Sequence, residues 1–455
     1  MNIRIFLAFF LLSAVSLSSR LHAQVIITVS GITTEGYEGD GGLASHCQMH
    51  WPEAIALNDS NNIFIADADN NVIREIDGSG KIRTVVGSGF ESGTGEGGYG
   101  GDGGPASAAR LNYPSGVAFD PAGNMYIADR RNSRIRMVNP AGVISTFAGN
   151  GTVGYTGDGA AASAAQLDSP TRVACDPSGN VYIADAGNNV IRMVTAATGN
   201  IATIAGNGTA GFGGDGGAAT MGILNGAQDM AIDPTGIIYI ADYKNSRIRK
   251  VDLTGNISTF AGIAYPGYSG DSGMATNANL FEPTGIATDA AGNVYFSDFA
   301  NARIRKIDAV TNIITTFAGD GIQGYGGDNG PAKAAKIYFP QGLAINSAGG
   351  VYICDKGNNR LRYASTTLAT PATTASFVGL NVFPNPGDGQ FTLHISSASD
   401  EKVQLILNNL AGQKVKEISA NTNQNTILDL NEPPGVYFIS AVTAHGTVNS
   451  KVFIR

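Results

Sequence analysis

The chain has 455 residues, of which 61 are glycine and only 15% are charged. This composition is typical of an all-β protein with many tight turns. The formal net charge of −8 and the absence of a basic run in the sequence argue against nucleic acid as a partner, because phosphate backbones would be repelled.

The first 23 residues have the pattern of a secretory signal peptide. Arg4 precedes an apolar stretch from Ile5 to Leu17, and Ala23 supplies a small residue before a cleavage point at Gln24. The apolar stretch is shorter than a membrane span, and the rest of the sequence has no continuous apolar segment of roughly 20 residues. We therefore expect residues 1–23 to be removed during export and the mature chain to have no membrane span.

Residues 24–364 contain six copies of one unit. Each copy has an aspartate at the end of an apolar run and an asparagine three residues later, and successive aspartates are 62, 56, 57, 56 and 57 residues apart. Four apolar segments of strand length lie between glycine-rich turns in each copy, which predicts a four-stranded propeller blade. We expect an all-β fold with a six-bladed β-propeller over residues 24–364. The repeat aspartates are Asp67, Asp129, Asp185, Asp242, Asp298 and Asp355.

The sixth copy lacks a fourth strand segment and stops after Tyr363. A segment with the missing pattern stands at the start of the mature chain, from Val25 to Ser30. Pairing this segment with the last blade would close the ring and remove an exposed sheet edge. We predict that the N-terminal strand completes the sixth blade.

The repeat aspartates could form a ring of metal ligands, but their neighbours indicate a structural turn. An asparagine and an arginine follow each of them, which favours a side-chain-capped turn with a local ion pair. A second aspartate series lies in Gly-Asp-Gly loops, which lack the alternating oxygen ligands of an all-protein calcium site. We expect no metal and no cofactor, with calcium at these loops as the alternative. The second series is Asp40, Asp102, Asp158, Asp215, Asp271 and Asp328.

Residues that break the repeat are better candidates for a ligand site than residues that keep it. The first strand of each blade is expected to be innermost, so its beginning should line the mouth of the central channel. There Arg172 and Asp229 replace the glycine or alanine of the other copies, and they could hold a charged ligand group or neutralise each other. The candidate ligand-binding residues are Trp51, Glu53, Tyr113, Arg172, Asp229, Glu282 and Phe339.

The propeller has few residues suited to catalysis. His46 and His50 are its only histidines, which excludes a three-histidine zinc site. An acid–base histidine could therefore lie only in the first loop. We identify no catalytic residue and expect the two histidines to be solvated.

A change in composition marks the end of the propeller. Residues 365–376 are rich in Ser, Thr, Ala and Pro, as in an extended linker. Residues 377–455 contain short alternating segments, such as Gln390 to Ile395 and Val436 to Ser440, which predict a small antiparallel β-sandwich.

One pattern of fixed residues recurs in the six copies. It reads Pro-x-Gly-Val-Ala-x-Asp-x-x-Gly-Asn-x-Tyr-Ile-Ala-Asp-x-x-Asn-x-Arg-Ile-Arg and is clearest from Pro114 to Arg136. This pattern resembles the NHL repeat, which implies a six-bladed propeller. The departures are local: Ala227 replaces the proline, and Val72 and Val190 replace the first arginine of the third strand.

The tail has a second set of recognisable positions. They are Val382-Phe383-Pro384-Asn385-Pro386 with Gly389, Leu410-Ala411-Gly412-Gln413, Gly435-Val436-Tyr437 and Lys451-Val452. In this order the positions resemble the C-terminal sorting domain of the type IX secretion system of Bacteroidetes. The resemblance implies that residues 377–455 engage the type IX secretion machinery. It also implies a protein that is secreted or held on the outer cell surface.

Together these features favour an exported binding protein over an enzyme. Its ligand is expected to be a protein, peptide or glycan on the face of the propeller that carries the long loops. Two alternatives stay open: a metal-dependent lyase or hydrolase acting at the channel mouth, and a structural component of the cell surface.

Overall fold

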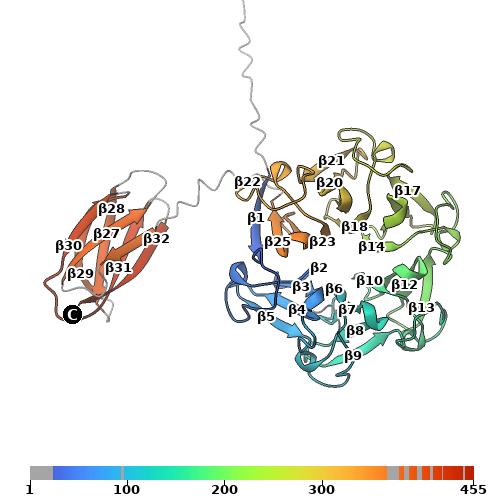
Figure 1. The fold of residues 1–455 in the computed structure, drawn as a ribbon, viewed down its shortest axis with the longest axis horizontal. Helices are drawn as coiled ribbons and strands as arrows, with labels where there is room; N and C mark the ends of the chain where they lie inside the picture. Colours follow the sequence, from blue (N-terminus) through green and yellow to red (C-terminus); the bar gives the residue numbers. More distant parts are fainter. Residues whose placement is uncertain are drawn as a thin grey trace, which may run out of the picture. The chain divides into compact units, whose positions relative to one another are not determined.

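The computed structural model describes residues 24–93, 97–365, 379–383, 389–396, 402–409, 413–422, 424–443 and 446–454. Residues 24–365 form a ring of six antiparallel sheets, so the predicted all-β, six-bladed propeller is confirmed (Figure 1). The predicted signal peptide, and the predicted linker apart from Ser365, lie outside the described residues.

Each of the first five blades is a sheet of four strands that pair in chain order. Blade 1 consists of β2 (Pro52–Leu57), β3 (Ile63–Asp67), β4 (Val72–Ile76) and β5 (Ile82–Val86). Blade 2 consists of β6 (Pro114–Phe119), β7 (Met125–Asp129), β8 (Arg134–Val138) and β9 (Ile144–Ala148). Blade 3 consists of β10 (Pro170–Cys175), β11 (Val181–Asp185), β12 (Val190–Val194) and β13 (Ile201–Ala205). Blade 4 consists of β14 (Ala227–Ile232), β15 (Ile238–Asp242), β16 (Arg247–Val251) and β17 (Ile257–Ala261). Blade 5 consists of β18 (Pro283–Thr288), β19 (Val294–Asp298), β20 (Arg303–Ile307) and β21 (Ile314–Ala318).

Blade 6 takes its outer strand from the other end of the propeller sequence. Its first three strands are β23 (Pro340–Ile345), β24 (Val351–Asp355) and β25 (Arg360–Ala364). The strand β1 (Val25–Ser30) pairs antiparallel with β25, and the two-residue strand β22 (Gly330–Pro331) pairs with the far edge of β1. Figure 1 shows the blue β1 beside the orange β25, which confirms the predicted closure by the N-terminal strand.

The apolar runs of the sequence are buried between adjacent blades. One core cluster joins Ala66 and Ile73 of blade 1 to Val117 and Ile127 of blade 2. The second strand of a blade is covered on both faces, and all five residues of β3 are buried. This two-sided burial explains why the second strands read as continuous apolar runs rather than as alternating ones.

Each blade also has two 3-10 helices of three residues. One precedes the first strand, and the other lies between the second and third strands. No helix among the residues with described positions is long and apolar enough to cross a membrane. The first series is η1 (Ala44–His46), η3 (Ala106–Ala108), η5 (Ala162–Ala164), η7 (Ala219–Met221), η9 (Ala275–Asn277) and η11 (Ala332–Ala334). The second series is η2 (Ala68–Asn70), η4 (Arg130–Asn132), η6 (Ala186–Asn188), η8 (Tyr243–Asn245), η10 (Phe299–Asn301) and η12 (Lys356–Asn358).

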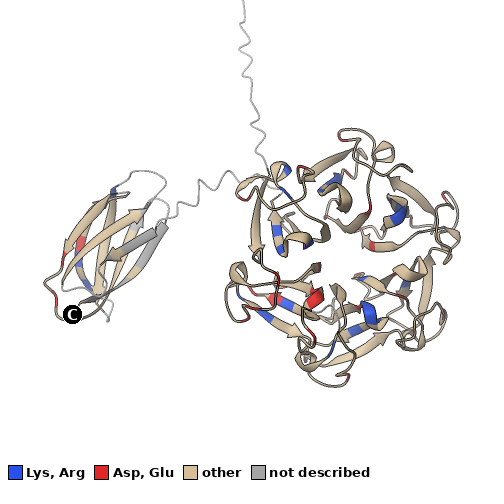
Figure 2. Ribbon diagram, in the orientation of Figure 1, with Lys and Arg blue, Asp and Glu red and all other residues tan. Residues whose placement is uncertain are grey.

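One fully buried arginine in each blade joins aspartates of both repeat series. In blade 5, Arg305 Nη1 lies 3.1 Å from Asp298 Oδ2, and Nη2 donates to Asp271 Oδ1 at 2.8 Å. Asp298 also accepts hydrogen bonds from the Asn301 side chain and from the Phe281 backbone. Since buried charges are tolerated only when they are paired, the arginine fixes the turn and the long loop together. The equivalent arginines are Arg74, Arg136, Arg192, Arg249, Arg305 and Arg362, and Figure 2 shows basic segments in the ribbons of all six blades.

The C-terminal unit is compact by itself and contains two antiparallel sheets. Leu393 from one sheet and Leu405 and Ile439 from the other belong to a single apolar core, as expected for a sandwich. The first sheet contains β26 (Gly379–Phe383), β27 (Gln390–Ser396) and β30 (Asn425–Asp429). The second contains β29 (Lys414–Asn421), β28 (Lys402–Asn409), β31 (Gly435–Thr443) and β32 (Gly446–Ile454).

Closure of the ring can be tested in β1, where two neighbouring isoleucines differ in exposure. Ile26 is 0% exposed and Ile27 is 39% exposed. We expect Ile26→Ala to destabilise the propeller by about 2–5 kcal/mol, because it leaves a cavity in the closing strand. Ile27→Ala should cost less than about 1 kcal/mol. The measurement is urea unfolding followed by the fluorescence of Trp51, the single tryptophan of the chain; equal losses would contradict the closing role.

Candidate functional site

The first strands of the blades line the central channel. Each of β2, β6, β10, β14, β18 and β23 lies against the first strands of its two neighbours around the ring (Figure 1). The residue before each of these strands has a left-handed backbone, and the six φ angles lie between 49° and 65°. Only blade 4 has glycine there, and the six residues are Trp51, Tyr113, Ser169, Gly226, Glu282 and Phe339.

Hydrogen bonds between blades hold some of these residues in the left-handed conformation. The backbone N–H of Tyr113 donates to Asn71 Oδ1 at 2.8 Å, and that of Trp51 donates to Asn359 Oδ1 at 3.0 Å. A bulky residue in this conformation costs about 1–3 kcal/mol, so it persists only where its surroundings fix it. The two aromatic side chains are therefore held at defined positions at the channel mouth.

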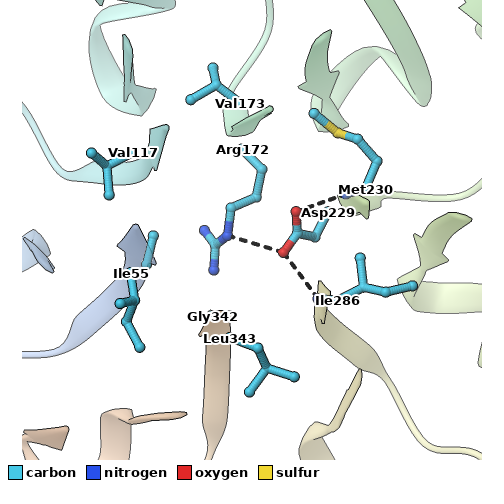
Figure 3. Close-up of a pocket in the computed structure, with 10 residues that line it drawn as sticks. Ile55, Val117, Arg172, Val173, Asp229, Met230, Ile286, Gly342 and Leu343 are labelled. Carbon is cyan, nitrogen blue, oxygen red and sulfur yellow. Dashed lines mark hydrogen bonds and ion pairs between the residues drawn. The ribbon is translucent and has the colours of Figure 1, made fainter. Parts of the chain in front are cut away.

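Arg172 fills the centre of the channel (Figure 3). Its Nη1 donates to the carbonyl oxygens of Ser115 and, at 3.0 Å, of Thr171, and its Nη2 donates to the carbonyl oxygen of Glu53 at 2.7 Å. Its Nε lies 3.5 Å from Asp229 Oδ2. One side chain from β10 thus bridges the first strands of blades 1, 2, 3 and 4.

The two carboxylates near Arg172 are also buried. Asp229 accepts from the backbone N–H groups of Met230 at 2.7 Å and Ile286 at 3.2 Å, and burial raises its pKa to about 6 although Arg172 opposes the shift. Burial also acts to raise the pKa of Glu53, but the charges of Lys356 and Arg172 outweigh it, so that pKa is lowered. Both acids therefore depend on the arginine for compensation.

Glycine at the equivalent position of other blades allows the first strands to approach closely. A Cβ atom on Gly285 would lie 2.1 Å from the carbonyl oxygen of Gln341. The remaining cavity, lined by residues from all six first strands, has a volume of only about 90 Å³, which is enough for a few water molecules. Any larger ligand must therefore bind at the mouth of the channel rather than inside it.

A polar cluster lies at the mouth where blades 6, 1 and 2 meet. Lys356 Nζ donates to Glu53 Oε1 at 2.7 Å and lies 3.4 Å from Tyr113 Oη, which itself donates to Glu53 Oε1 at 2.9 Å. The same ammonium group lies 4.6 Å from the centre of the Trp51 ring. Burial, followed by the charge of Glu53, raises the pKa of Tyr113, so the phenol stays protonated as a donor.

Two arginines of η4 extend the cluster across blade 2. The guanidinium carbons of Arg130 and Arg131 lie 5.7 Å and 4.6 Å from the centre of the Tyr113 ring. Arg131 is exposed and Arg130 is half-buried. We call the group formed by Trp51, Glu53, Tyr113, Arg130, Arg131 and Lys356 the mouth sector.

The sequence search did not identify Lys356, Arg130 or Arg131. All three lie between the Asp and the Asn of the second-strand turn, where the repeat leaves two positions free. Those pairs read Ala68-Asp69, Arg130-Arg131, Ala186-Gly187, Tyr243-Lys244, Phe299-Ala300 and Lys356-Gly357. The differences among the six copies at these two positions are the sequence signal that points to the basic residues.

His50 is half-buried rather than fully solvated, contrary to the expectation from the sequence. Its Nε2 lies 3.4 Å from Glu35 Oε2 and 3.5 Å from Asp69 Oδ2. Its ring contacts that of Trp51 edge-on, with the ring centres 5.9 Å apart. His50 therefore borders the mouth sector, whereas His46 is exposed in η1.

The remaining predicted site residues lie toward blades 5 and 6. Phe339 stacks on Phe299 and Tyr338, with ring centres 4.7 Å and 4.3 Å apart. Glu282 hydrogen-bonds Tyr243 and contributes, after burial, to raising the pKa of that phenol to about 12. The structure thus brings Trp51, Glu53 and Tyr113 together through Lys356, places Arg172 and Asp229 below them, and leaves Phe339 and Glu282 in other contacts.

The two aspartate series are fully engaged in hydrogen bonds and ion pairs. Asp271, for example, accepts a hydrogen bond from Arg305 on one carboxylate oxygen and one from the backbone N–H of Thr316 on the other. Within the described chain, no cluster of three or more histidine, cysteine, aspartate or glutamate residues is arranged to hold a metal ion.

Comparison with known families identifies both parts of the chain. Residues 224–251 and 338–362 match the NHL repeat, and residues 88–155 and 264–322 match the teneurin NHL domain. Residues 381–455 match the secretion system C-terminal sorting domain. The chain is therefore an NHL-repeat propeller with a type IX sorting domain, and it is exported to the cell surface or the extracellular space.

The propeller also has relatives among characterised proteins. Protein SUPPRESSOR OF QUENCHING 1, chloroplastic, of Arabidopsis thaliana is 32% identical over 339 residues, which cover 69% of this chain and 30% of the relative. Teneurin-1 of Gallus gallus is 28% identical over 281 residues, which cover 56% of this chain and 10% of the relative. The chain thus spans less than a third of the length of either relative.

Two solved structures share the fold. A protein of unknown function from Bacteroides thetaiotaomicron has a TM-score of 0.56 at 18% identity, with 75% of this chain and 76% of that chain covered. An auxiliary nutrient binding protein from Bacteroides ovatus has a TM-score of 0.55 at 17% identity, with 76% and 77% covered. At this level of identity the similarity establishes the propeller architecture.

The bridging role of Arg172 predicts strong coupling with Asp229. Arg172→Gly and Asp229→Gly should each destabilise the propeller by about 3–5 kcal/mol, because each leaves a buried charge without its partner. The double variant has glycine at both positions, as blades 2, 5 and 6 do. Its loss of folding stability should be clearly smaller than the sum of the losses in the two single variants. Urea unfolding of the four proteins measures the coupling, and strictly additive losses would show that the pair does not act as a unit.

The two aspartate series predict an optimum of stability in mild acid. Burial raises the pKa of Asp67 to about 6 and of Asp185 to about 7. Their protonated forms therefore contribute fully to the folding stability below pH 4, and this contribution is lost as the pH rises through 6 to 7. For Asp102 and Asp271, burial is outweighed by threonine and arginine donors and the pKa is lowered. That contribution is lost as the pH falls below about 4. The thermal midpoint should therefore be higher at pH 5 than at pH 8 or pH 3, and a midpoint that rises steadily to pH 8 would contradict this assignment.

Proposed function

We propose that the protein is an exported binding protein that captures a glycan at the mouth sector. The observation that carries the proposal is the gathering, in blades 6, 1 and 2, of side chains that the repeat does not require. Trp51 is 42% exposed, and Lys356 and Tyr113 lie within hydrogen-bond reach of the same Glu53 carboxylate. A fixed, exposed aromatic face beside the Lys356 ammonium group suits a ligand with both apolar and hydroxylated surfaces, as sugar rings have.

The surrounding loops support an asymmetric site. The loop between β5 and β6 accounts for the longest repeat interval, 62 residues, and its residues 90–93 lie against the turn of blade 1. The backbone N–H of Gly93 donates to the carbonyl oxygen of Asp69 at 2.9 Å, and Asn71 Nδ2 donates to that of Phe90 at 3.2 Å. Residues 90–93 of this loop therefore stand next to the mouth sector, where a single binding site would be expected to break the six-fold repetition.

Export agrees with this assignment. The sorting domain directs the chain to the outer surface or the medium, where extracellular polymers are present. The Glu53–Lys356 and Arg172–Asp229 ion pairs give the site a rigid base, which lowers the entropy lost when a ligand binds.

An array of glycans and peptides tests the proposal with the purified protein. We expect glycan hits and at least about a tenfold loss of affinity in Trp51→Ala, equivalent to about 1.4 kcal/mol. Tyr265→Ala is the matched control, since Tyr265 is a 72% exposed aromatic residue on another long loop, and it should bind as the parent does. Peptide hits only, a blank array, or a glycan recovered in shortened form would contradict a glycan-binding function.

A further inference from the structure

We propose that the captured glycan is acidic and that Arg130 and Arg131 bind its carboxylate or sulfate groups. This inference rests on the proposed function and specifies the ligand class of the same site. It rests on the difference between the charged side chains at the channel mouth that form ion pairs and those that form none.

The charges of Glu53, Lys356, Arg172 and Asp229 balance one another. Glu53 Oε1 lies 2.7 Å from Lys356 Nζ, and Glu53 Oε2 lies 3.8 Å from Arg172 Nη2. Asp229 completes the set through its 3.5 Å contact with Arg172 Nε. Two acids and two bases thus compensate each other, and this group leaves no net charge for a ligand.

Arg130 and Arg131 stand outside this balance. Among the residues whose positions are described, no carboxylate forms an ion pair with either arginine, and both guanidinium groups pack on the Tyr113 ring. Over a longer distance, the charge of Arg130 acts on Glu53 and that of Arg131 acts on Asp69. The nearest turn carboxylate, Asp69, is instead 3.5 Å from His50 Nε2. A chain with a net charge of −8 therefore presents, at the edge of its most irregular surface, two positive charges that form no ion pair with a described carboxylate.

The two guanidinium groups are placed for recognition rather than left free in solvent. The turn that bears them is fixed by the hydrogen bond from the Arg131 backbone N–H to the Asn112 carbonyl oxygen at 3.1 Å. Tyr113, against which they pack, is held by its bond to Glu53. Packing on an aromatic ring leaves the N–H edge of a guanidinium available, and this planar edge matches the paired oxygens of a carboxylate or sulfate.

The path from Trp51 to Arg131 indicates an extended ligand. Trp51 contacts Lys356, Lys356 lies near the Tyr113 hydroxyl, and the Tyr113 ring contacts Arg131. These contacts run from blade 1 through the turn of blade 6 to blade 2. An acidic oligosaccharide could place a ring on Trp51 and an anionic group of another ring on the arginines.

Pairs of glycans that differ only in charge test the inference. The probes are oligogalacturonate, alginate and hyaluronan with their methyl-esterified forms, and a sulfated galactan with its desulfated form, titrated calorimetrically. We expect at least one charged form to bind at least about tenfold tighter than its neutral form, and the preference to weaken with salt because the contact is exposed. The variant Arg130→Gln/Arg131→Gln should lose this preference while keeping the parent's thermal midpoint.

Lys244→Gln is the matched control, because Lys244 is exposed and occupies in η8 the position that Arg131 occupies in η4. It should retain the preference for the charged form. Equal affinity for charged and neutral forms, or a preference that survives the double arginine variant, would overturn the acidic-glycan assignment while leaving glycan binding intact. No binding to any acidic probe would also overturn it, and the neutral glycans of the array then decide separately whether the proposed function stands.

Discussion

The propeller depends on a buried arginine that joins two aspartates in every blade. Arg305, for example, connects the Asp298 turn, the Asp271 loop and the third strand in which it lies. Because Asp271 also accepts from Thr316 in the outer strand, the network spans the blade from its inner turn to its outer edge. Burying such a triad is unfavourable unless all partners are present, so the network specifies one arrangement of loop, turn and strand.

Repetition of this network frees other positions for function. The arginine, the two aspartates and the asparagine form the structural network in each blade. The two residues between the aspartate and the asparagine of the second-strand turn are not part of this network. In blades 2 and 6 these positions hold Arg130, Arg131 and Lys356. The fold itself presents them around the channel mouth, so a few substitutions in short turns can create a binding surface without disturbing the core.

The central channel shows how one irregular pair can serve architecture rather than recognition. Arg172 and Asp229 break the repeat as clearly as any residues do, yet their side chains are 4% and 10% exposed and engage each other. Their partners are main-chain carbonyl and N–H groups of the surrounding first strands. A residue that departs from the repeat therefore lies in surroundings that differ from those in the other blades. Whether it can contact a ligand depends on how exposed its side chain is.

The six blades, their closure by the N-terminal strand and the sorting domain could be predicted from the sequence, because they follow from local periodicity and repeated motifs. It also placed Trp51, Glu53 and Tyr113 at the channel mouth, since they precede or begin first strands. The contact of Lys356 with Glu53, 303 residues away in the chain, is visible only in the folded structure. The same holds for the absence of an ion pair between a described carboxylate and Arg130 or Arg131. Ring closure brings the last blade against the first, and charge compensation across that junction depends on distances in space that no local sequence pattern encodes.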